Sequence, residues 1–267
     1  MELVVNNLSK TYPNGVRALK NVSLRIGRGI FGLLGQNRAG KSTLMRTIAT
    51  VQEADQGSIH FNGIDAFRQP QSLWKILGYL PQEFGVYPNI TAEKLLHYMA
   101  DLKGIAKKSE RQEVVTSLLE KVGLFDVRKK KLSCYSNGMK QRFGLAQVLI
   151  GHPKLIIVDE PTAGLAPVER NRFYDLLAAL SEHKVVVLST HLIEDVSMLC
   201  SDVAVMDRGE ILLTGKPSEI ENALRNRPWE VRINKEKVDR YQAAHQAIAS
   251  RFKLSRRLTG FKITQKK

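Results

Sequence analysis

Residues 35–43 read GQNRAGKST, which fits the pattern GxxxxGK[ST]. The apolar run Ile30–Leu34 comes directly before them, and apolar residues continue at helical spacing over residues 44–49. A loop between a strand and a helix presents backbone N–H groups and the positive end of the helix dipole to one point, where phosphate oxygens bind well. We therefore expect Lys41 to reach the β- and γ-phosphates of a nucleotide, and the Ser42 hydroxyl to bind Mg²⁺.

Two acids follow a second apolar run. Leu155–Val158 reads as a buried strand, and Asp159 and Glu160 come directly after it. The carboxyl ends of parallel strands meet at one edge of a sheet, so both acids are expected near the phosphate loop. There Asp159 would hold Mg²⁺ and Glu160 would polarise an attacking water. His191 closes another predicted strand, over residues 184–188, and is expected to contact the γ-phosphate from the same edge.

The remaining pattern is that of a mixed α/β chain. Strands predicted over residues 2–8 and 16–26 are expected to pair antiparallel around the turn Tyr12–Gly15. From residue 91 to 150 the apolar spacing is helical, with interruptions at Gly104, Gly123 and the basic run 128–131, which indicates an inserted helical subdomain. The other predicted elements are strands at residues 57–61 and 78–80, a hairpin of strands at 203–206 and 211–213, and helices at 71–77, 168–181 and 217–224.

The composition does not suggest a secreted or membrane-spanning chain. The first residues, MELVVNNLSK, lack the basic and apolar regions of a signal peptide, and the apolar runs are far shorter than the roughly 20 residues of a membrane span. We therefore expect a soluble protein. Its two cysteines, Cys134 and Cys200, indicate neither a disulfide framework nor a metal site. We expect both to be small buried apolar residues in a reducing compartment.

The C-terminal region differs from the rest in charge. Of the formal charge of +15, +9 lies in residues 221–267, where 13 Lys and Arg residues stand against 4 acids. Two interpretations stay open: a surface that meets nucleic acid or an anionic membrane, and a merely solvated surface. Strand spacing at Val231 and Ile233, a helical pattern over 237–252 and strand character at 261–263 predict a small β-α-β appendage within residues 226–267.

Taken in order, these pieces resemble the ATP-binding subunit of an ABC transporter over residues 2–225. Residues 35–43 and the run LIIVDEP at 155–161 are similar to the Walker A and Walker B motifs of that family. Five further matches are the adenine-stacking aromatic residue at Tyr12, the Q-loop glutamine at Gln82, a signature-like YSNGMKQR at 135–142, a D loop at 163–166 and the switch histidine at His191.

The resemblance implies a fold and a ligand set. The implied fold is an α/β P-loop NTPase core with a parallel sheet, an N-terminal antiparallel β subdomain and the helical insertion at about residues 91–150, within a nucleotide-binding domain over residues 1–225. The implied catalytic residues are Glu160, His191 and Gln82, and the implied Mg²⁺ ligands are Ser42, Gln82 and Asp159. ATP is expected to contact Tyr12, Val16, Asn37, Arg38, Ala39, Gly40, Lys41, Ser42, Thr43, Ser136 and Gly138.

The resemblance also implies partners: a second ATP-binding subunit, identical or different, and an integral-membrane permease. The two subunits would meet head to tail, with each ATP between the phosphate loop of one and Ser136 and Gly138 of the other. Hydrolysis would remove the shared phosphate and open the pair, which drives the permease. The run GVYPNITAEKLL at residues 85–96 and the basic C-terminal region are most like ATPases of drug, antibiotic or polysaccharide exporters, at the cytoplasmic face of the cell membrane.

Three residues depart from the family's pattern. Arg38 and Asn137 stand where the phosphate loop and the signature have glycines, and Ala166 stands where the D loop has an aspartate. A non-glycine residue at positive φ costs on the order of 1 kcal/mol plus any clash. Arg38 would offset part of that cost by its charge, and asparagine tolerates positive φ better than most residues. We expect that ATP still binds and that turnover is reduced.

Two other functions compete with an energy-coupling ATPase. A catalytically silent nucleotide-binding subunit, the structural or regulatory half of a heterodimer, is supported by the three departures and opposed by Glu160 and His191. An ABC protein that acts on nucleic acid is suggested by the charge. The sequence has neither a second nucleotide domain, nor a long coiled coil, nor a basic groove lined with aromatics, so no nucleic-acid partner is expected.

Overall fold

A computed structural model of the chain describes residues 1–85, 87–225, 229–233, 249–255 and 258–263. Its internal contacts divide the chain into two units, Met1–Pro217 and Ser218–Lys267. The domain boundary predicted after residue 225 stays a prediction. Within the described residues, no helix combines the length and the apolar character that crossing a membrane requires.

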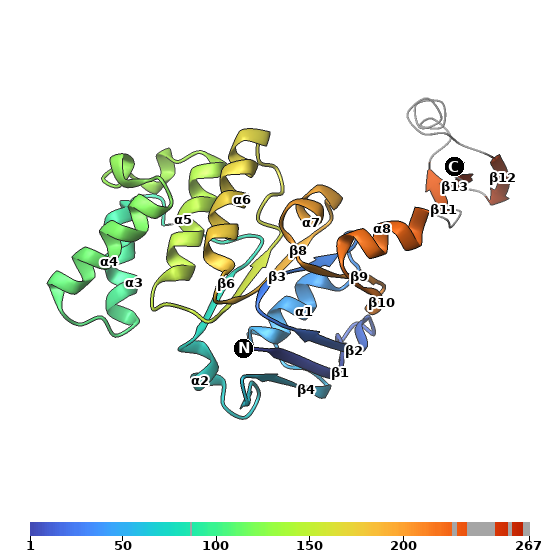
Figure 1. The fold of residues 1–267 in the computed structure, drawn as a ribbon, viewed down its shortest axis with the longest axis horizontal. Coiled ribbons are helices and arrows are strands. Elements are labelled where there is room, and N and C mark those ends of the chain that lie inside the picture. Colours follow the sequence, from blue (N-terminus) through green and yellow to red (C-terminus); the bar gives the residue numbers. More distant parts are fainter. Residues whose placement is uncertain (86, 226–228, 234–248, 256–257, 264–267) are drawn as a thin grey trace. The chain divides into compact units, whose positions relative to one another are not determined.

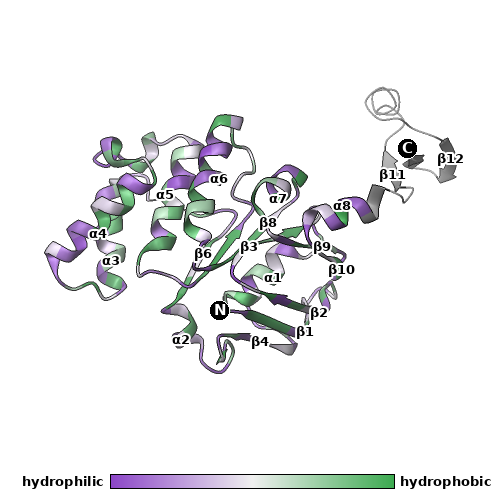
Figure 2. Ribbon diagram, viewed as in Figure 1, coloured by the Kyte–Doolittle hydropathy of each residue, from purple (hydrophilic) through white to green (hydrophobic). Residues whose placement is uncertain are grey.

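A six-stranded sheet forms the centre of the first unit (Figure 1). Its strands lie in the order β10-β9-β3-β8-β7-β6, and all neighbours pair in parallel except β10 at the edge. The parallel strands read as continuous apolar runs because both faces of the sheet are covered (Figure 2). Their bounds are β3 (Gly29–Leu34), β6 (Leu77–Leu80), β7 (Leu155–Asp159), β8 (Val185–Thr190), β9 (Asp202–Asp207) and β10 (Glu210–Gly215).

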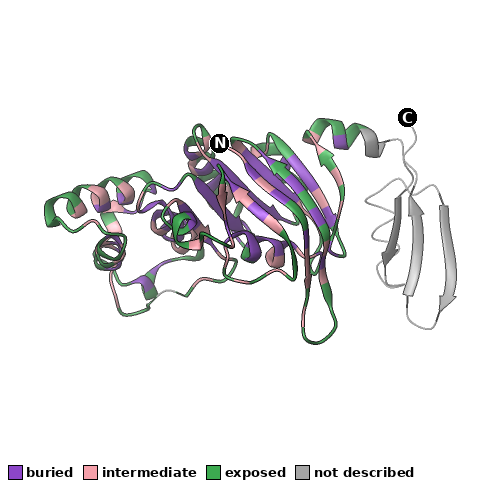
Figure 3. Cartoon of the chain, turned by 90° about the horizontal axis from the view of Figure 1, so that it is seen from below, coloured by how far each residue is buried: buried purple, intermediate pink, exposed green. Residues whose placement is uncertain are grey.

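Alternate residues of these strands enter two different cores, because successive side chains of a strand point to opposite faces. Leu155 and Ile157 of β7 pack into the core that contains helix α1 (Lys41–Ile48). Ile156 and Val158 pack on the opposite face against α5 (Asn137–Leu149) and α6 (Pro167–Ser181). Both faces of the sheet are thus covered, and Figure 3 shows that its strands in the first unit are largely buried.

A second, antiparallel sheet lies on the other side of α1. It has the order β2-β1-β4-β5, and α1 contacts β2 as well as β7 and β8 of the large sheet. The predicted antiparallel pairing of the two N-terminal strands is confirmed. The bounds are β1 (Leu3–Thr11), β2 (Arg17–Ile26), β4 (Gln56–Phe61) and β5 (Ile64–Asp65).

The predicted helical subdomain is present with its own hydrophobic core. It consists of α3 (Ala92–Leu102), α4 (Lys108–Lys121), the 3₁₀ turns Phe125–Val127 and Leu132–Cys134, and α5. Gly104 and Gly123 have φ of +88° and +64° just beyond the ends of α3 and α4. Glycine adopts this left-handed conformation without strain, so both helices end where the sequence predicts.

The predictions for one helix and for the two cysteines were wrong. The helix expected over residues 71–77 is α2 (Pro70–Trp74), which is shorter because Leu77 already pairs in β6. Cys134 is exposed and Cys200 is only partly buried. In the 3₁₀ turn that Cys134 ends, Leu132 takes the buried position. Burial still raises the pKa of the Cys200 thiol to about 12.

The rest of the first unit follows the predicted order, and α8 (Pro217–Arg225) lies at the unit boundary. Helix α7 (Ile193–Leu199), between β8 and β9, was not predicted. The second unit contains an antiparallel sheet of β11 (Trp229–Ile233), β13 (Leu258–Ile263) and β12 (Ala249–Ser255). The strand predictions near residues 231 and 261 are confirmed. Residues 249–252, expected in a helix, lie in β12 because they pair with β13. The rest of that predicted helix, 237–248, lies outside the described residues.

Candidate functional site

The segments that follow β3, β7 and β8 meet at one edge of the large sheet. These three strands are neighbours. They end at Leu34, directly before the phosphate loop, at Asp159, directly before Glu160, and at Thr190, directly before His191. Parallel pairing brings their carboxyl ends together, so the phosphate loop, Glu160 and His191 lie side by side. The topology therefore assembles residues that are far apart in the sequence.

The phosphate loop ends in a helix start that no side chain caps. Gly40 precedes α1 with φ of +108°, and a Cβ there would lie 2.5 Å from the Ala18 carbonyl oxygen. The first turn of α1 has no acidic residue and no side-chain cap in the part of the chain described. Because the first N–H groups of a helix lack intrahelical acceptors, this end is suited to an anion.

Lys41 is almost fully buried at this helix start, with 4% of its surface exposed. Its Nζ atom donates to the carbonyl oxygens of Gly35 at 2.8 Å and Gln36 at 3.1 Å. It also lies 3.0 Å from Oε1 of Glu160, which is 6% exposed. These three contacts use the ammonium's hydrogen-bonding capacity and pair its charge, as burial of both groups requires.

Glu160 is held between Lys41 and His191. Its Oε2 atom lies 3.0 Å from Nδ1 of His191. Its backbone adopts φ of +47°, which is strained for a residue with a side chain. The Glu160 N–H donates to the carbonyl oxygen and to Oγ of Ser189, both at 3.1 Å, and so fixes the strained backbone. The carboxylate therefore has one defined position at the mouth of the phosphate loop.

Asp159 lies deeper, with 1% of its surface exposed. Ser42 Oγ donates to Asp159 Oδ1 at 3.3 Å, and Ser189 Oγ donates to the same oxygen at 2.5 Å. Hydroxyl and carboxylate oxygens are the donors that Mg²⁺ takes from a protein, and water and substrate phosphates fill the rest of its shell. Ser42 and Asp159 thus fit an Mg²⁺ ion that arrives with a nucleotide.

A cavity of about 790 Å³ opens in front of Lys41, Ser42 and Glu160. Asp159 and His191 contact Ser42 and Glu160 but do not themselves line it. Tyr12 stands at its wall, with its hydroxyl 3.1 Å from Thr43 Oγ1 and donating to Gln52 Oε1 at 2.9 Å. These bonds fix the direction of the phenol ring. The volume lies within the range of small-molecule sites. Ten residues predicted from the sequence line the cavity: Tyr12, Val16, Asn37, Arg38, Gly40, Lys41, Ser42, Thr43, Gln82 and Glu160.

Some predicted residues lie elsewhere, and some lining residues were missed. Ala39 is buried behind the loop, and Ser136 and Gly138 belong to α5 and do not line the cavity. The missed lining residues are Gly15, Arg17, Ala18, Lys20, Arg208 and Gly209. Arg208 and Gly209 form the turn between β9 and β10, and the Gly209 N–H donates to the Ala39 carbonyl oxygen at 2.8 Å. Only the pairing of β9 with β3 places that turn here, so no local signal indicates it.

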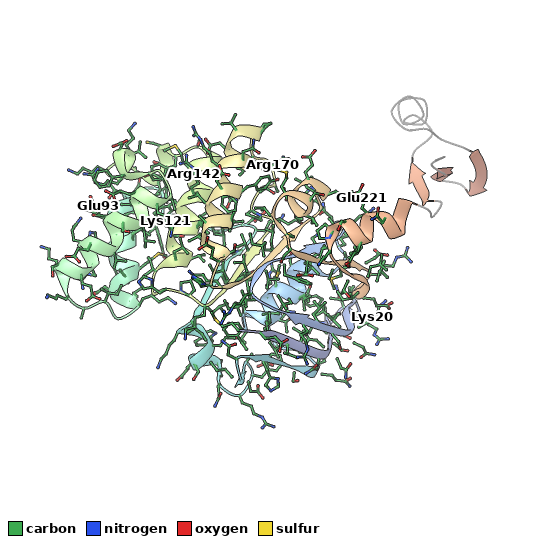
Figure 4. All side chains as sticks on the ribbon, in the orientation of Figure 1. Lys20, Glu93, Lys121, Arg142, Arg170 and Glu221 are labelled. Atoms are coloured by element: carbon green, nitrogen blue, oxygen red, sulfur yellow. The ribbon has the colours of Figure 1, made fainter. Side chains whose placement is uncertain are left out.

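The signature-like segment starts α5. Ser136 is the N-cap, and its Oγ accepts from the Met139 N–H at 3.2 Å. A Cβ at Gly138 would overlap the Glu169 side chain of α6, so any larger residue there would have to displace that carboxylate. Oε2 of Glu169 lies 3.3 Å from Nε of Arg142, which Figure 4 labels. The Glu169 carboxylate thus packs the start of α5 against α6.

The three departures from the family's pattern have different structural consequences. Arg38 has φ of +72°, so the strain expected of a non-glycine residue is present there. Asn137 does not have a positive φ and is the first residue of α5, so the concern about a left-handed backbone at this position was wrong. Ala166 is the N-cap of α6 and offers no side-chain acceptor to the first N–H groups of that helix.

Comparisons with known proteins agree with this geometry. The pattern that defines the family described as ABC transporter matches residues 19–163. The uncharacterised ABC transporter ATP-binding protein YxlF of Bacillus subtilis is 34% identical over 238 residues, 89% of this chain and 78% of YxlF. The daunorubicin/doxorubicin resistance ATP-binding protein DrrA of Streptomyces peucetius is 31% identical over 231 residues, 86% of this chain and 69% of DrrA.

A solved structure is similar over most of the chain as well. It is an ATP-binding cassette in a dimeric, post-hydrolysis state bound to ADP and Pi, with a TM-score of 0.73 and 27% sequence identity. The similarity covers 80% of this chain and 98% of that one.

Proposed function

This chain belongs to the family of ABC transporter ATP-binding proteins, and from that premise we propose that it hydrolyses Mg-ATP to drive a separate membrane permease of the exporter type. The observation that carries the proposal is a set of contacts that join Ser42 to Asp159, Lys41 to Glu160, and Glu160 to His191. Ser189 Oγ connects the first pair to the others, because it donates to Asp159 and accepts from the Glu160 N–H. These side chains come from three segments, the start of α1 and the carboxyl ends of β7 and β8, and together they provide the groups that phosphoryl transfer needs.

Catalysis depends on a change of partner for Lys41. The ammonium neutralises Glu160 in the structure, and the phosphates of ATP compete for the same ammonium. Once Lys41 binds phosphate, the Glu160 carboxylate becomes available to orient the attacking water, and His191 keeps it in place while contacting the γ-phosphate. Gln82, which lines the same cavity, completes the polar wall. When bound, Mg²⁺ at Ser42 and Asp159 neutralises charge on the phosphate oxygens.

The second half of the site comes from another ATP-binding subunit. Ser136 is exposed at the start of α5, and its hydroxyl is placed to meet the γ-phosphate on a partner. The solved dimer of a related cassette supports this pairing. Loss of the γ-phosphate removes the ligand that both subunits share, and the pair opens.

The permease docks at a groove between β6, α3 and α5. A cavity of about 330 Å³ lies there, next to the segment that leads to Gln82. Leu102 and Tyr98 of α3 are 71% and 61% exposed, and Tyr87 is 70% exposed, an apolar set that a protein partner would cover. Movement of Gln82 with the nucleotide would reach a permease in this groove directly.

Export of a drug-like compound is the finer part of the proposal. It is supported by relatives such as DrrA, whose name states resistance to daunorubicin and doxorubicin. The basic C-terminal residues add a second contact, to the anionic cytoplasmic face of the membrane. A silent regulatory subunit of a heterodimer remains the alternative, because Ala166 and the strained Arg38 both depart from the family's pattern.

Phosphate release by the full-length chain tests the proposal. We expect release that saturates with ATP and requires Mg²⁺. The silent subunit would be favoured if the wild-type chain bound ATP without releasing phosphate and the triple variant Arg38→Gly, Asn137→Gly, Ala166→Asp released it. Failure to bind millimolar Mg-ATP would overturn both functions.

The permease is tested by purifying the chain from detergent-solubilised membranes of its source cells, with Leu102→Glu as the matched variant. An integral-membrane protein should accompany the wild-type chain and be lost with the variant, while ATP binding is unchanged in both. An equal yield of that protein with both chains would show that it docks elsewhere.

A further inference from the structure

A buried carboxylate outside the nucleotide cavity connects the two segments that carry the catalytic groups. Asp195, in the first turn of α7, is 0% exposed. Its Oδ2 accepts from Thr162 Oγ1 at 2.7 Å and from Thr190 Oγ1 at 2.5 Å. Its Oδ1 accepts from the Tyr174 hydroxyl of α6. Both threonines are 1% exposed, so water does not replace these bonds.

The two threonines flank the catalytic pair. Thr162 follows Glu160 by two residues, and Thr190 comes directly before His191. Thr190 Oγ1 also accepts from the Leu192 N–H at 3.0 Å. The same hydroxyl thus closes the backbone turn around His191 and donates to Asp195. Oδ2 of Asp195 thus connects the segment that follows Glu160, through Thr162, to the segment around His191, through Thr190.

We propose that Asp195 is a positioning residue for hydrolysis, which holds the Glu160 carboxylate and the His191 ring at their mutual distance through the hydroxyls of Thr162 and Thr190. The inference rests on the proposed ATP hydrolysis. The strained backbone at Glu160 gives Asp195 its importance, because a residue with φ of +47° keeps that conformation only where its surroundings fix it. Ser189 fixes Glu160 from one side, and the Asp195 network fixes the segment beyond it.

Tyr174 has a different part in the network. It comes from α6, away from both catalytic segments, and burial raises the pKa of its phenol, with the Asp195 carboxylate adding to the effect. The phenol therefore stays protonated and donates to Asp195. Removing this hydroxyl weakens the network without releasing either threonine, which makes Tyr174→Phe a matched control for the loss of one buried hydrogen bond to Asp195.

The test uses the full-length chain with Asp195→Asn, which keeps the shape and removes the charge. A misplaced catalytic group costs on the order of 100-fold in rate. We expect a kcat lower by about 10- to 100-fold with little change in KM for ATP, since Lys41 and Tyr12 are untouched. Tyr174→Phe should keep a kcat close to that of the wild type. If Asp195→Asn raised KM for ATP and left kcat unchanged, the proposal would be overturned.

Amide hydrogen exchange provides a readout that does not depend on activity. Asp195→Asn should speed exchange in both residues 160–163 and residues 189–192, and Tyr174→Phe should speed it less. Unchanged exchange in either segment would overturn the proposal even if the wild type hydrolyses ATP. An inactive wild-type chain that still shows these differences in exchange would overturn the proposed function, while the structural part of the inference, that Asp195 holds both segments, would stand.

A second pair of variants covers the case in which Asp195→Asn does not fold. Thr190→Ser retains the hydroxyl and should retain kcat, whereas the nearly isosteric Thr190→Val should lose it to the same extent as Asp195→Asn. Equal kcat values for the two Thr190 variants would overturn the proposal.

Discussion

Helices α1 and α5 both begin at segments that resemble nucleotide-binding motifs of the family, yet their starts are prepared differently. The start of α1 has no side-chain cap among the described residues, and it carries the buried Lys41 against Glu160. The start of α5 is capped by Ser136 and is exposed there. A pre-organised anion site costs little reorganisation when the ligand binds. The comparison teaches that the chain builds one half of the site internally and leaves the other half to meet a partner.

The largest expected effect is at the internal half. Glu160→Gln removes the carboxylate that orients water and keeps its shape, so phosphate release should fall by about 10²- to 10⁴-fold while ATP stays bound. Steady-state phosphate release and equilibrium dialysis with labelled ATP measure the two properties. Glu194→Gln is the control, because Glu194 is an exposed acid paired with Arg170 on the neighbouring helix. Release that persists with Glu160→Gln would remove Glu160 from the mechanism.

The external half should affect assembly more than binding. Ser136→Ala removes the hydroxyl expected to reach a partner's γ-phosphate, and a hydrogen bond to a charged group accounts for about 10- to 100-fold in affinity. Sedimentation with Mg-ATP in the Glu160→Gln background should show weaker dimers, while ATP binding by the monomer is unchanged. Ser136→Thr retains the hydroxyl and should restore the dimer. An undiminished dimer with Ser136→Ala would mean that the two helix starts do not share a nucleotide.

Helix α6 also begins without a side-chain cap, but no phosphate is predicted to bind there. A substitution at its N-cap therefore tests the effect of capping on stability without a change in ligand binding. Ala166→Asp should stabilise the fold by about 1 kcal/mol, because an aspartate at the N-cap accepts from the first N–H groups. Thermal unfolding should show a rise in Tm of roughly 2–4 °C. Ala166→Ser should stabilise the fold too, since serine is also a good cap. A rise in activity with neither variant changing Tm would assign Ala166 to the dimer contact instead.

The smallest expected effect is at Arg38. Arg38→Gly relieves a left-handed backbone that costs on the order of 1 kcal/mol, and it also removes a positive charge from the cavity wall. The two changes oppose each other in ATP binding, so we expect a few-fold lower affinity with a weaker dependence on salt. Isothermal titration at two salt concentrations measures this. His152→Gly, at φ of +54° and exposed outside the cavity, controls for the backbone alone. An affinity independent of salt in the wild type would exclude a role for the Arg38 charge.

The sequence predicts which segments meet at the phosphate loop, because their residues lie in short motifs. The glycine-bounded loop, the acids after β7 and the histidine after β8 each sit at a strand end, and parallel pairing is enough to bring them together. The same reasoning predicts the two sheets and the helical subdomain from apolar spacing.

The supporting groups could not be predicted in this way. Asp195 and Ser189 are ordinary polar residues in the sequence, and they matter only through partners placed by folding, such as Thr162. The exposure of Cys134 likewise depends on the 3₁₀ turn that it ends, in which Leu132 takes the buried position. Buried hydrogen-bond networks thus escape a search that uses spacing alone.

The buried ion pair of Lys41 and Glu160 limits which mutations the chain can tolerate. Both charges are buried, and a substitution that removes one leaves the other without a counter-charge in the interior, which typically costs about 3–5 kcal/mol. Most mutations at either codon would therefore lower the amount of folded protein in the cell as well as its turnover. Selection against misfolding and selection for transport would act on the same two side chains. Substitutions at either position should therefore be disfavoured for two independent reasons.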